Sequence, residues 1–399
     1  YFADIGLDAV VGSVGGGATL RLIADIPGVT YTEGRFLPYF FPDTFYEGND
    51  PCVEARENWL TARRALMRKP LDRIGYGGYL SLAYRFPDFV DYIEKLTDEF
   101  REIHEKIHGQ KPWCGLRVAV LNCWGKLRSW QTYMVAHALW YKQTYSYFGM
   151  LEALSGMSVD VCFLSFDDIL EHGIPEDVDV IINAGDAHTA FSGGSCWEDE
   201  KLICLLRRWV YEGGGIVGIG EPSAVHRNGQ FFQLADVFGV DKELGFTLST
   251  DKYFTKQLET HYLTEDRTEA FDFGEGMKNI YALGADTEVV EYSDHELHIA
   301  AHGYGKGNSV YLAGLPYSCA NSRLLLRALY CAARREEKLY RWYADNPHCE
   351  VHAYPDAGIY AVLNNSGEEQ TTVVYDGLGR TSKVCLEAGA ILWKTADAE

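Results

Sequence analysis

Short apolar runs alternate with longer amphipathic segments over the first part of the chain. Apolar runs at residues 7–11 and 29–32 predict buried strands. Apolar side chains at helical spacing predict helices at residues 19–26, 54–68 and 88–108. Strands followed by helices in this order are typical of a (β/α)8 barrel, and we therefore assign residues 1–112 to the C-terminal part of a TIM barrel.

A second series of strands and helices follows, up to residue 345. Its apolar strands are expected at 118–122, 159–165, 178–183, 215–220 and 309–313. Its helices are expected at 130–155, 197–212 and 322–333. Strands alternating with helices imply a mainly parallel sheet, so residues 113–345 are predicted to form a doubly wound α/β domain.

The pattern changes again over residues 346–399, where short strands are separated by Asp, Gly and Asn. The strands are expected at 350–354, 359–364, 370–375 and 391–394. We assign this part to a small all-β domain. We expect its core and that of the middle domain to be independent of the barrel.

The overall charge excludes some classes of partner. The 399 residues carry a formal net charge of −21, which disfavours binding to nucleic acid or to an anionic lipid surface. No apolar run is long enough to cross a bilayer. The ten cysteines include no CxxC pair and are typical of free thiols in a reducing compartment. We therefore expect a cytoplasmic protein without nucleic-acid or membrane partners.

Residues 104–108, HEKIH, match the H-E-x-x-H zinc pattern on a predicted helix. This helix is highly charged and ends at Gly109, and no third ligand is evident nearby. The more ordinary interpretation is a solvated helix end, and we predict no metal site here.

Residues 218–223, GIGEPS, follow a predicted strand and suggest a dinucleotide site. The third glycine of that motif is missing and Pro222 stands where the helix should begin, so no dinucleotide cofactor is predicted. The same segment takes the position of a nucleophile elbow. Class I glutamine amidotransferases carry Cys there and this chain has Glu221, which cannot replace a thiolate. The middle domain thus resembles that fold without its active site, and structural support or dimerisation is expected of it.

The strongest candidate site lies in the barrel part. Loops after the last strands of such barrels often bind phosphate, and backbone N–H groups around Gly15 and Gly16 are suited to that. Arg35, in the loop expected after strand 29–32, could contact two phosphate oxygens at once. Tyr39 and Phe41 alternate along the same segment and could stack on a sugar ring. The alternative is that Arg35 pairs with Glu33 and that the aromatic side chains belong to the core.

Four stretches carry a resemblance to a known family. They are GLDAVVGSV at residues 6–14, TEGRFLPYFFPDTF at 32–45, RIGYGGYL at 73–80 and GLPYS at 314–318. The chain closely resembles the lacto-N-biose/galacto-N-biose phosphorylases, the 1,3-β-galactosyl-N-acetylhexosamine phosphorylases, over its whole length. The resemblance implies a TIM barrel, an amidotransferase-like middle domain and a small β domain, in that order.

It also implies inverting phosphorolysis of a β-galactosyl disaccharide, with inorganic phosphate as co-substrate and no metal or organic cofactor. Arg35 matches the position expected at the phosphate, and Tyr39 and Phe41 match positions that line the sugar sites. The family's general acid is an Asp on the barrel strand upstream of Tyr1, and Asp4 and Asp8 do not stand in that motif. We therefore expect part of the barrel to precede Tyr1, and the catalytic residue is left unassigned.

Several alternatives remain open. The acceptor sugar could be N-acetylglucosamine, N-acetylgalactosamine or L-rhamnose, the last in a galactosyl-1,4-L-rhamnose phosphorylase. The same barrel and middle domain could also belong to a β-galactosidase-like hydrolase or to a non-catalytic carbohydrate-binding scaffold. For each alternative we expect a homodimer whose ligands are small molecules.

Overall fold

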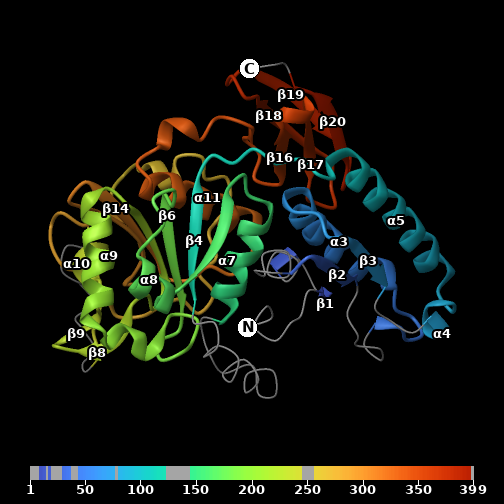
Figure 1. The fold of residues 1–399 in the computed structure, drawn as a ribbon. Helices are drawn as coiled ribbons and strands as arrows, with labels where there is room; N and C mark the ends of the chain where they lie inside the picture. The colour runs from blue at the N-terminus through green and yellow to red at the C-terminus, as the bar shows by residue number, and fades with distance from the viewer. Residues whose placement is uncertain are drawn as a thin grey trace. The chain divides into compact units, whose positions relative to one another are not determined.

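The computed structural model describes residues 9–14, 17–18, 29–36, 44–76, 80–122, 144–244 and 256–396. The chain forms two compact units (Figure 1). The first unit consists of Tyr1–Trp113, Leu154–Ser158 and Tyr340–Glu399, and the second unit of Cys114–Ala153 and Val159–Leu339. The second unit is therefore an insertion within the sequence of the first.

The first unit begins with a parallel sheet of three strands in the order β1 (Ala9–Val14), β2 (Tyr31–Phe36) and β3 (Arg73–Tyr76). The prediction that Arg35 lies in a loop after residue 32 is wrong. β2 continues to Phe36, because its backbone pairs with β1 on one side and with β3 on the other. Strand β3 was not predicted, since four residues that include Gly75 give little strand signal.

Two long helices, α3 (Pro51–Arg68) and α5 (Pro87–Ile107), pack together, and a short helix α4 (Leu80–Ala83) precedes α5. α3 begins where Asp50 accepts a hydrogen bond from the Cys52 N–H at 2.9 Å, with Pro51 in the first turn. Its predicted apolar face is confirmed, since Trp59 and Leu66 are buried. Both helices were predicted, with starts a few residues too late.

The C-terminal part of the first unit is all-β, as predicted, and contains two three-stranded antiparallel sheets. One sheet consists of β15 (Tyr343–Ala344), β18 (Gln370–Tyr375) and β19 (Thr381–Leu386), and the other of β16 (Cys349–Tyr354), β17 (Ile359–Asn364) and β20 (Ile391–Thr395). The bounds of β17 and β18 agree with the prediction. β19 was missed, because its first three residues are exposed and polar.

The prediction that the core of the β part is independent of the barrel part is wrong. Tyr360 and Val362 of β17 belong to a cluster within the β part, whereas Ala361 and Leu363 pack in the cluster of α3 and α5. Successive residues of a strand point to opposite faces, so β17 contributes to both cores. The Tyr354 hydroxyl on β16 donates to the Met67 carbonyl on α3.

The second unit is built on a seven-stranded sheet in the order β12-β13-β14-β7-β6-β4-β5. Its parallel strands are β4 (Arg117–Asn122), β5 (Asp160–Ser165), β6 (Val180–Gly185), β7 (Gly215–Gly220) and β14 (Gly307–Leu312). The mainly parallel sheet is thus confirmed. An antiparallel hairpin of β12 (Glu288–Ser293) and β13 (Glu296–Tyr304) extends one edge and was not predicted.

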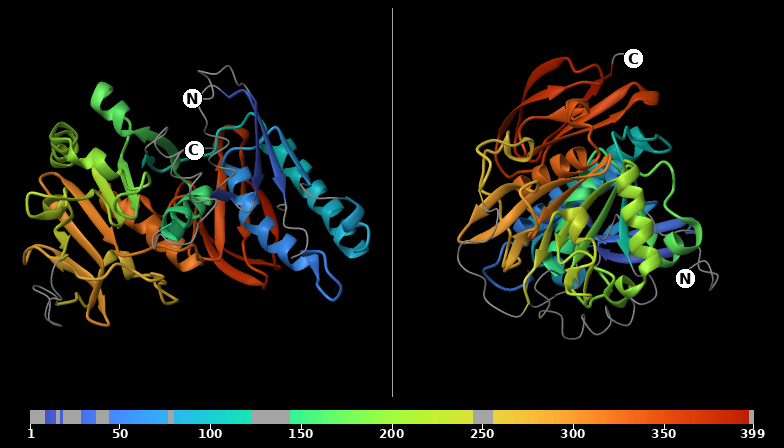
Figure 2. Two further views of the ribbon diagram at one scale, coloured as in Figure 1. Left: turned by 90° about the horizontal axis from the view of Figure 1, so that it is seen from below. Right: turned by 90° about the vertical axis from the view of Figure 1, so that its left-hand side faces the viewer.

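Helices cover both faces of this sheet. α8 (Phe166–His172) and α9 (Glu200–Glu212) lie over one face and α11 (Cys319–Ala332) over the other (Figures 1 and 2). α9 begins later than residue 197 because Asp199 caps it, and the turn η1 (Gly194–Glu198) precedes it. Of the helix predicted at 130–155, the structure describes α7 (Thr144–Gly156), and residues 123–143 lie outside the described part.

Smaller elements complete the second unit. They are β8 (Ala224–Arg227), β9 (Gln230–Phe232), α10 (Ala235–Phe238), β10 (Val240–Lys242), η2 (Tyr262–Thr264), β11 (Ile280–Ala282) and η3 (Glu336–Lys338). In the β part of the first unit, η4 (Pro355–Ala357) joins β16 to β17.

Candidate functional site

The candidate phosphate residue Arg35 lies in the second half of β2, near the carboxyl end of the parallel sheet. Its register partners are Ser13 on β1 and Gly75 on β3. Two positions closer to the start of the strands, the register joins Val11, Glu33 and Arg73. Arg35 thus stands two positions closer to the carboxyl edge of the sheet than Glu33.

The Glu33 carboxylate has a described partner of its own on the neighbouring strand. Arg73 donates to it at 3.2 Å, with side-chain exposures of 17% for Glu33 and 65% for Arg73. At the start of β2, the Asp72 carboxylate accepts from the Thr32 N–H at 2.7 Å and from its hydroxyl at 3.1 Å. Asp72, just before β3, and Arg73, at its first position, thus bind side chains and backbone at the start of β2.

The other candidate residues of this site lie outside the described part of the chain. They are Gly15, Gly16, Tyr39 and Phe41. Gly17 and Ala18, which follow the glycine loop, are helical and buried.

The HEKIH segment forms the last turn of α5. The rings of His104 and His108 are stacked with centroids 4.6 Å apart, and the His108 N–H caps the helix on the His104 carbonyl at 2.8 Å. Over the described ranges, no three His, Cys, Asp or Glu side chains are grouped so that they could hold a metal ion. The absence of zinc from the protein stays a prediction.

Glu221 directly follows β7 and is buried at the carboxyl edge of the large sheet. One carboxylate oxygen accepts from the Ala187 N–H at 2.7 Å, and the other forms an ion pair with Lys242 on β10. Gly220 has φ of 77°, which gives the chain its sharp turn before Glu221. Because both of its carboxylate oxygens are bound, Glu221 connects the loops after β6 and β7. The sequence analysis did not identify its partner Lys242.

Asn183 makes a second connection between the same two loops. Its amide group donates to the Ser192 carbonyl at 2.9 Å, and its carbonyl oxygen accepts from the Ser223 N–H at 2.7 Å. This edge is the place where doubly wound domains bind ligands. Here Glu221 is bound to Lys242 and to the Ala187 N–H, and Asn183 is bound to backbone groups of both loops.

A buried ionic cluster joins α3 to β16 in the first unit. The Arg64 guanidinium forms a bidentate pair with the Glu350 carboxylate, with Nε–Oε1 at 2.9 Å and Nε–Oε2 at 3.0 Å. Burial by itself would raise the pKa of Glu350, but the charge of Arg64 and hydrogen bonds from His352 and Arg64 outweigh it and lower that pKa to about 2. Burial lowers the pKa of His352, which is fully enclosed.

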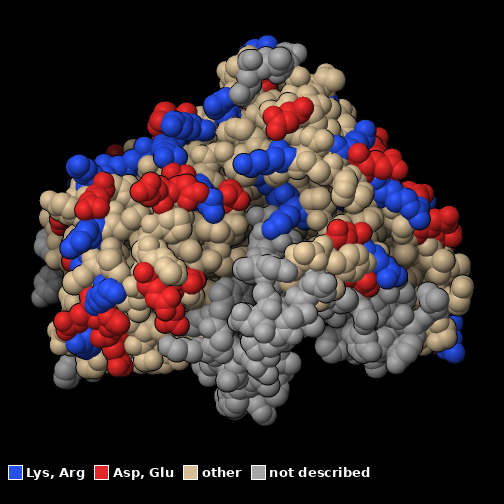
Figure 3. Space-filling view, in the orientation of Figure 1, with Lys and Arg blue, Asp and Glu red and all other residues tan. Residues whose placement is uncertain are grey.

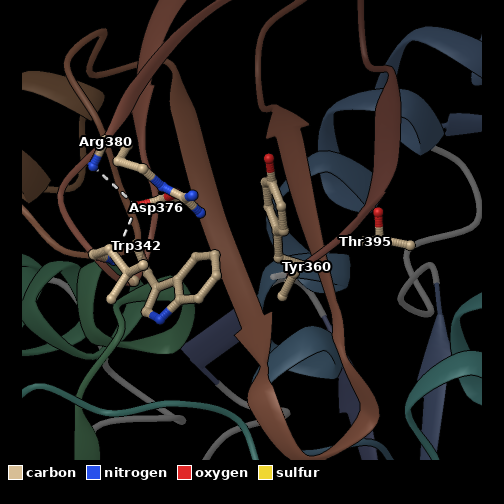
Figure 4. Close-up of a pocket in the computed structure, with 8 residues that line it drawn as sticks. Trp342, Tyr360, Asp376, Arg380 and Thr395 are labelled. Atoms are coloured by element: carbon tan, nitrogen blue, oxygen red, sulfur yellow. Dashed lines mark hydrogen bonds and ion pairs between the residues drawn. The ribbon is translucent and has the colours of Figure 1, made fainter. Parts of the chain in front are cut away.

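A pocket that the sequence did not indicate opens in the C-terminal β part (Figure 4). We call it the β-domain pocket, and its lining includes Trp342, Tyr360, Asp376, Leu378, Arg380 and Thr395. The residues come from the ends of β15, β17, β18, β19 and β20 and from the turn between β18 and β19. No sequence signal joins them, because they are spread over more than fifty positions.

Hydrogen bonds hold the charged pair of this pocket. The Arg380 Nε donates to the Asp376 carboxylate at 2.7 Å, and the other carboxylate oxygen accepts from the N–H groups of Leu378 at 2.8 Å and Arg380 at 2.9 Å. Burial would raise the pKa of Asp376, but these hydrogen bonds and the Arg380 charge outweigh it, so the pKa lies below its usual value.

The described surface carries charges of both signs (Figure 3). On the described part of the face in Figure 3, acidic side chains interleave with basic ones. Among the helices that the structure describes, none combines the length and the apolarity needed to cross a membrane.

Comparison with protein families gives three matches along the chain. A model described as the lacto-N-biose phosphorylase N-terminal TIM barrel domain matches residues 1–115. The lacto-N-biose phosphorylase central domain matches residues 117–337, and the C-terminal domain of the same family matches residues 342–394.

Two curated proteins show the range of relatives. A 1,3-β-galactosyl-N-acetylhexosamine phosphorylase of Lachnoclostridium phytofermentans is 56% identical over 98% of this chain and 54% of its own length. A D-galactosyl-β-1→4-L-rhamnose phosphorylase of the same organism is 37% identical over 94% of this chain and 51% of its own length. The chain thus spans about half the length of these relatives.

A solved structure shares the fold at low identity. The cold-adapted β-galactosidase from Rahnella sp. R3 is 13% identical, with a TM-score of 0.51 over 95% of this chain and 57% of that protein. At this identity the likeness concerns the fold alone.

Proposed function

Because the chain belongs to the lacto-N-biose phosphorylase family, we propose that it acts in the inverting phosphorolysis of a β-galactosyl disaccharide. The products would be galactose 1-phosphate and the free acceptor sugar. The observation that carries this proposal is the 56% identity, over 98% of the chain, to a 1,3-β-galactosyl-N-acetylhexosamine phosphorylase. We expect residues 1–112 to supply the C-terminal part of the barrel, 113–345 the amidotransferase-like domain and 346–399 the β domain.

The proposed step needs few catalytic groups. A phosphate oxygen attacks the anomeric carbon, the glycosidic bond breaks, and the bridging oxygen takes a proton from a general acid. Phosphate replaces the water and the general base of an inverting hydrolase, so one carboxylic acid suffices. We assign this acid to none of the described residues.

Arg35 is proposed to bind the phosphate. It lies near the carboxyl end of β2, on the edge where barrels of this kind bind substrates. A guanidinium can donate two parallel hydrogen bonds to phosphate and partly neutralise its charge. Gly15 and Gly16 are proposed to add backbone N–H donors, and Tyr39 and Phe41 to contact the sugars. Inorganic phosphate is then a co-substrate, and no metal or organic cofactor takes part.

The acceptor is proposed to be an N-acetylhexosamine. Identity to the L-rhamnose-linked phosphorylase is 37%, well below the 56% to the N-acetylhexosamine enzyme. Synthesis from galactose 1-phosphate tests this point. N-acetylglucosamine or N-acetylgalactosamine should be galactosylated faster than L-rhamnose, and the reverse order would reassign the acceptor.

Product analysis tests the reaction itself. Lacto-N-biose and galacto-N-biose are incubated with the full-length protein, with and without inorganic phosphate. Galactose 1-phosphate should form only when phosphate is present. Free galactose formed without phosphate would identify a hydrolase, and no product from either disaccharide would favour a carbohydrate-binding scaffold. The homodimer and the cytoplasmic location stay predictions, to be tested by light scattering and by fractionation of the source cells.

A further inference from the structure

The β-domain pocket has the composition of a small-molecule site, although nothing in the proposed reaction requires it. Pockets that bind neutral polar ligands usually combine aromatic side chains with a few fixed polar groups. We propose that the β-domain pocket binds a neutral sugar, at a site separate from the barrel site around Arg35. The inference does not depend on the phosphorolysis proposed above.

Two aromatic rings give the pocket an apolar wall. The ring centroids of Trp342 and Tyr360 lie 5.2 Å apart, and the two ring planes are tilted by 50° to each other. In the view of Figure 4, Trp342 and Arg380 lie on one side of Tyr360 and Thr395 lies on the other. The C–H groups of a sugar are apolar and its hydroxyls are polar, so this combination of rings and polar groups suits it.

The charged pair favours a neutral ligand. Asp376 and Arg380 neutralise each other, and the backbone of the same turn holds the carboxylate in place. A phosphate brought to this pair would meet the fixed negative charge of Asp376. A sugar hydroxyl both donates and accepts, and adjacent hydroxyls can satisfy a carboxylate and a guanidinium together.

The indole of Trp342 points to a binding role rather than to packing alone. Its N–H is buried, and it has no hydrogen-bond partner among the residues that the structure describes. A buried donor without a partner is costly unless a ligand or a water satisfies it. Trp342 also has φ of 50°, a backbone conformation that side-chain-bearing residues rarely adopt and that concentrates at functional sites.

Gly377 lets the turn approach this indole. A Cβ at this position would lie 2.7 Å from the indole Cζ2 and 3.0 Å from Nε1, too close for any other residue. The turn that carries Asp376 and Arg380 is therefore fitted against the edge of Trp342. Leu378, which also lines the pocket, is 57% exposed and leaves apolar surface for a longer saccharide.

Binding to the full chain tests the proposal. Calorimetric titrations with galactose, N-acetylglucosamine, N-acetylgalactosamine and L-rhamnose should give saturable binding of at least one sugar. Arg380→Ala should weaken it at least tenfold. Because Arg380→Ala could disturb the turn, Thr395→Val serves as a second variant that removes one hydroxyl at nearly constant volume, and it should weaken binding at least threefold.

Two controls separate this site from others. Thr371→Val changes an exposed threonine on β18 outside the pocket and should leave binding unchanged. Tyr39→Ala should also leave it unchanged, because Tyr39 is proposed to contact sugar in the barrel site and not in this pocket. The proposal is overturned if no sugar saturates, if inorganic phosphate saturates the pocket in place of sugar, or if Thr395→Val binds like the unchanged protein. Loss of sugar binding in Tyr39→Ala alone would move the site to the barrel.

Discussion

Arg64 on α3 and Glu350 on β16 form a bidentate ion pair across 286 positions of sequence. The Arg64 side chain is 1% exposed and that of Glu350 is 18% exposed. The Tyr354–Met67 hydrogen bond also joins β16 to α3, so both contacts fasten the C-terminal β part to the helix between β2 and β3. This contact yields two predictions.

Arg64→Ala should destabilise the protein by about 3–5 kcal/mol, because it leaves the Glu350 carboxylate buried without its partner. Urea unfolding followed by circular dichroism measures this loss. Arg101→Ala is the matched control. Arg101 pairs with Asp98 at 2.6 Å on the exposed face of α5, and its loss should cost about 0–1 kcal/mol. Equal losses in the two variants would contradict the role given to Arg64.

The same pair sets a dependence of stability on pH. The folded pKa of Glu350 is lowered from 4.5 to about 2. The stability it contributes is therefore present above pH 4.5 and is lost as the pH falls toward 2. About 3 kcal/mol is expected over this range. Unfolding free energies at several pH values should fall less steeply in Glu350→Gln than in the unchanged protein. Parallel profiles would show that Glu350 does not titrate as described.

Arg35→Ala should impair the use of phosphate more than the binding of disaccharide. Charge-assisted contacts to a charged ligand are worth about 1.5–3 kcal/mol, so kcat/KM for phosphate should fall about tenfold to a hundredfold. Steady-state kinetics with varied phosphate measures this, and Arg35→Lys should restore part of the loss. Arg101→Ala again serves as control. Unchanged phosphate kinetics in Arg35→Ala would remove Arg35 from the site.

Lys242→Met should reduce stability without changing the turnover of the folded protein. The substitution leaves the buried Glu221 carboxylate without its cation, which costs about 3 kcal/mol. The double variant Glu221→Gln with Lys242→Met should recover most of this loss, because no charge is then left unpaired. Unfolding curves and initial rates at low temperature separate the two effects. A large fall in turnover at unchanged stability would instead give Glu221 a part in the chemistry.

Metal chelation should leave the activity intact, despite the histidines of α5. The stacked rings of His104 and His108 occupy a helix end, and no third ligand is grouped with them among the described residues. Elemental analysis, together with assays after chelator treatment, checks this. Stoichiometric zinc whose removal abolishes activity would reverse the interpretation.

The sequence allowed the regular elements to be predicted where their pattern is strong. β17 is a continuous apolar run up to Asn364, β18 is rich in Thr and Val, and both lie between clear turns, so their bounds were predicted correctly. β2 was placed too early, because Glu33, Gly34 and Arg35 resemble a loop. Pairing on both sides makes them a strand, and no local pattern contains that information.

Buried charges were the hardest feature to predict. From the sequence alone, Arg64 would be expected to be an exposed helix residue, and its partner Glu350 lies in another part of the sequence. The β-domain pocket was missed for the same reason, since Trp342 and Arg380 meet only after the β part has folded. For the barrel site, Arg35 was proposed from the expected loop position and from a resemblance, and its role stays a prediction.

β17 packs in two apolar clusters, and this has a consequence for biosynthesis. Its Ala361 and Leu363 complete the apolar cluster of α3 and α5, yet residues 114–339 must be translated between these helices and β17. At about 5–20 residues per second, the ribosome needs about 10–45 s to make that stretch. During this interval the inner faces of α3 and α5 lack the strand that later shields them. A nascent chain paused there should recruit holdase chaperones, and ribosome profiling of chaperone-bound chains should show their engagement ending once β17 has emerged.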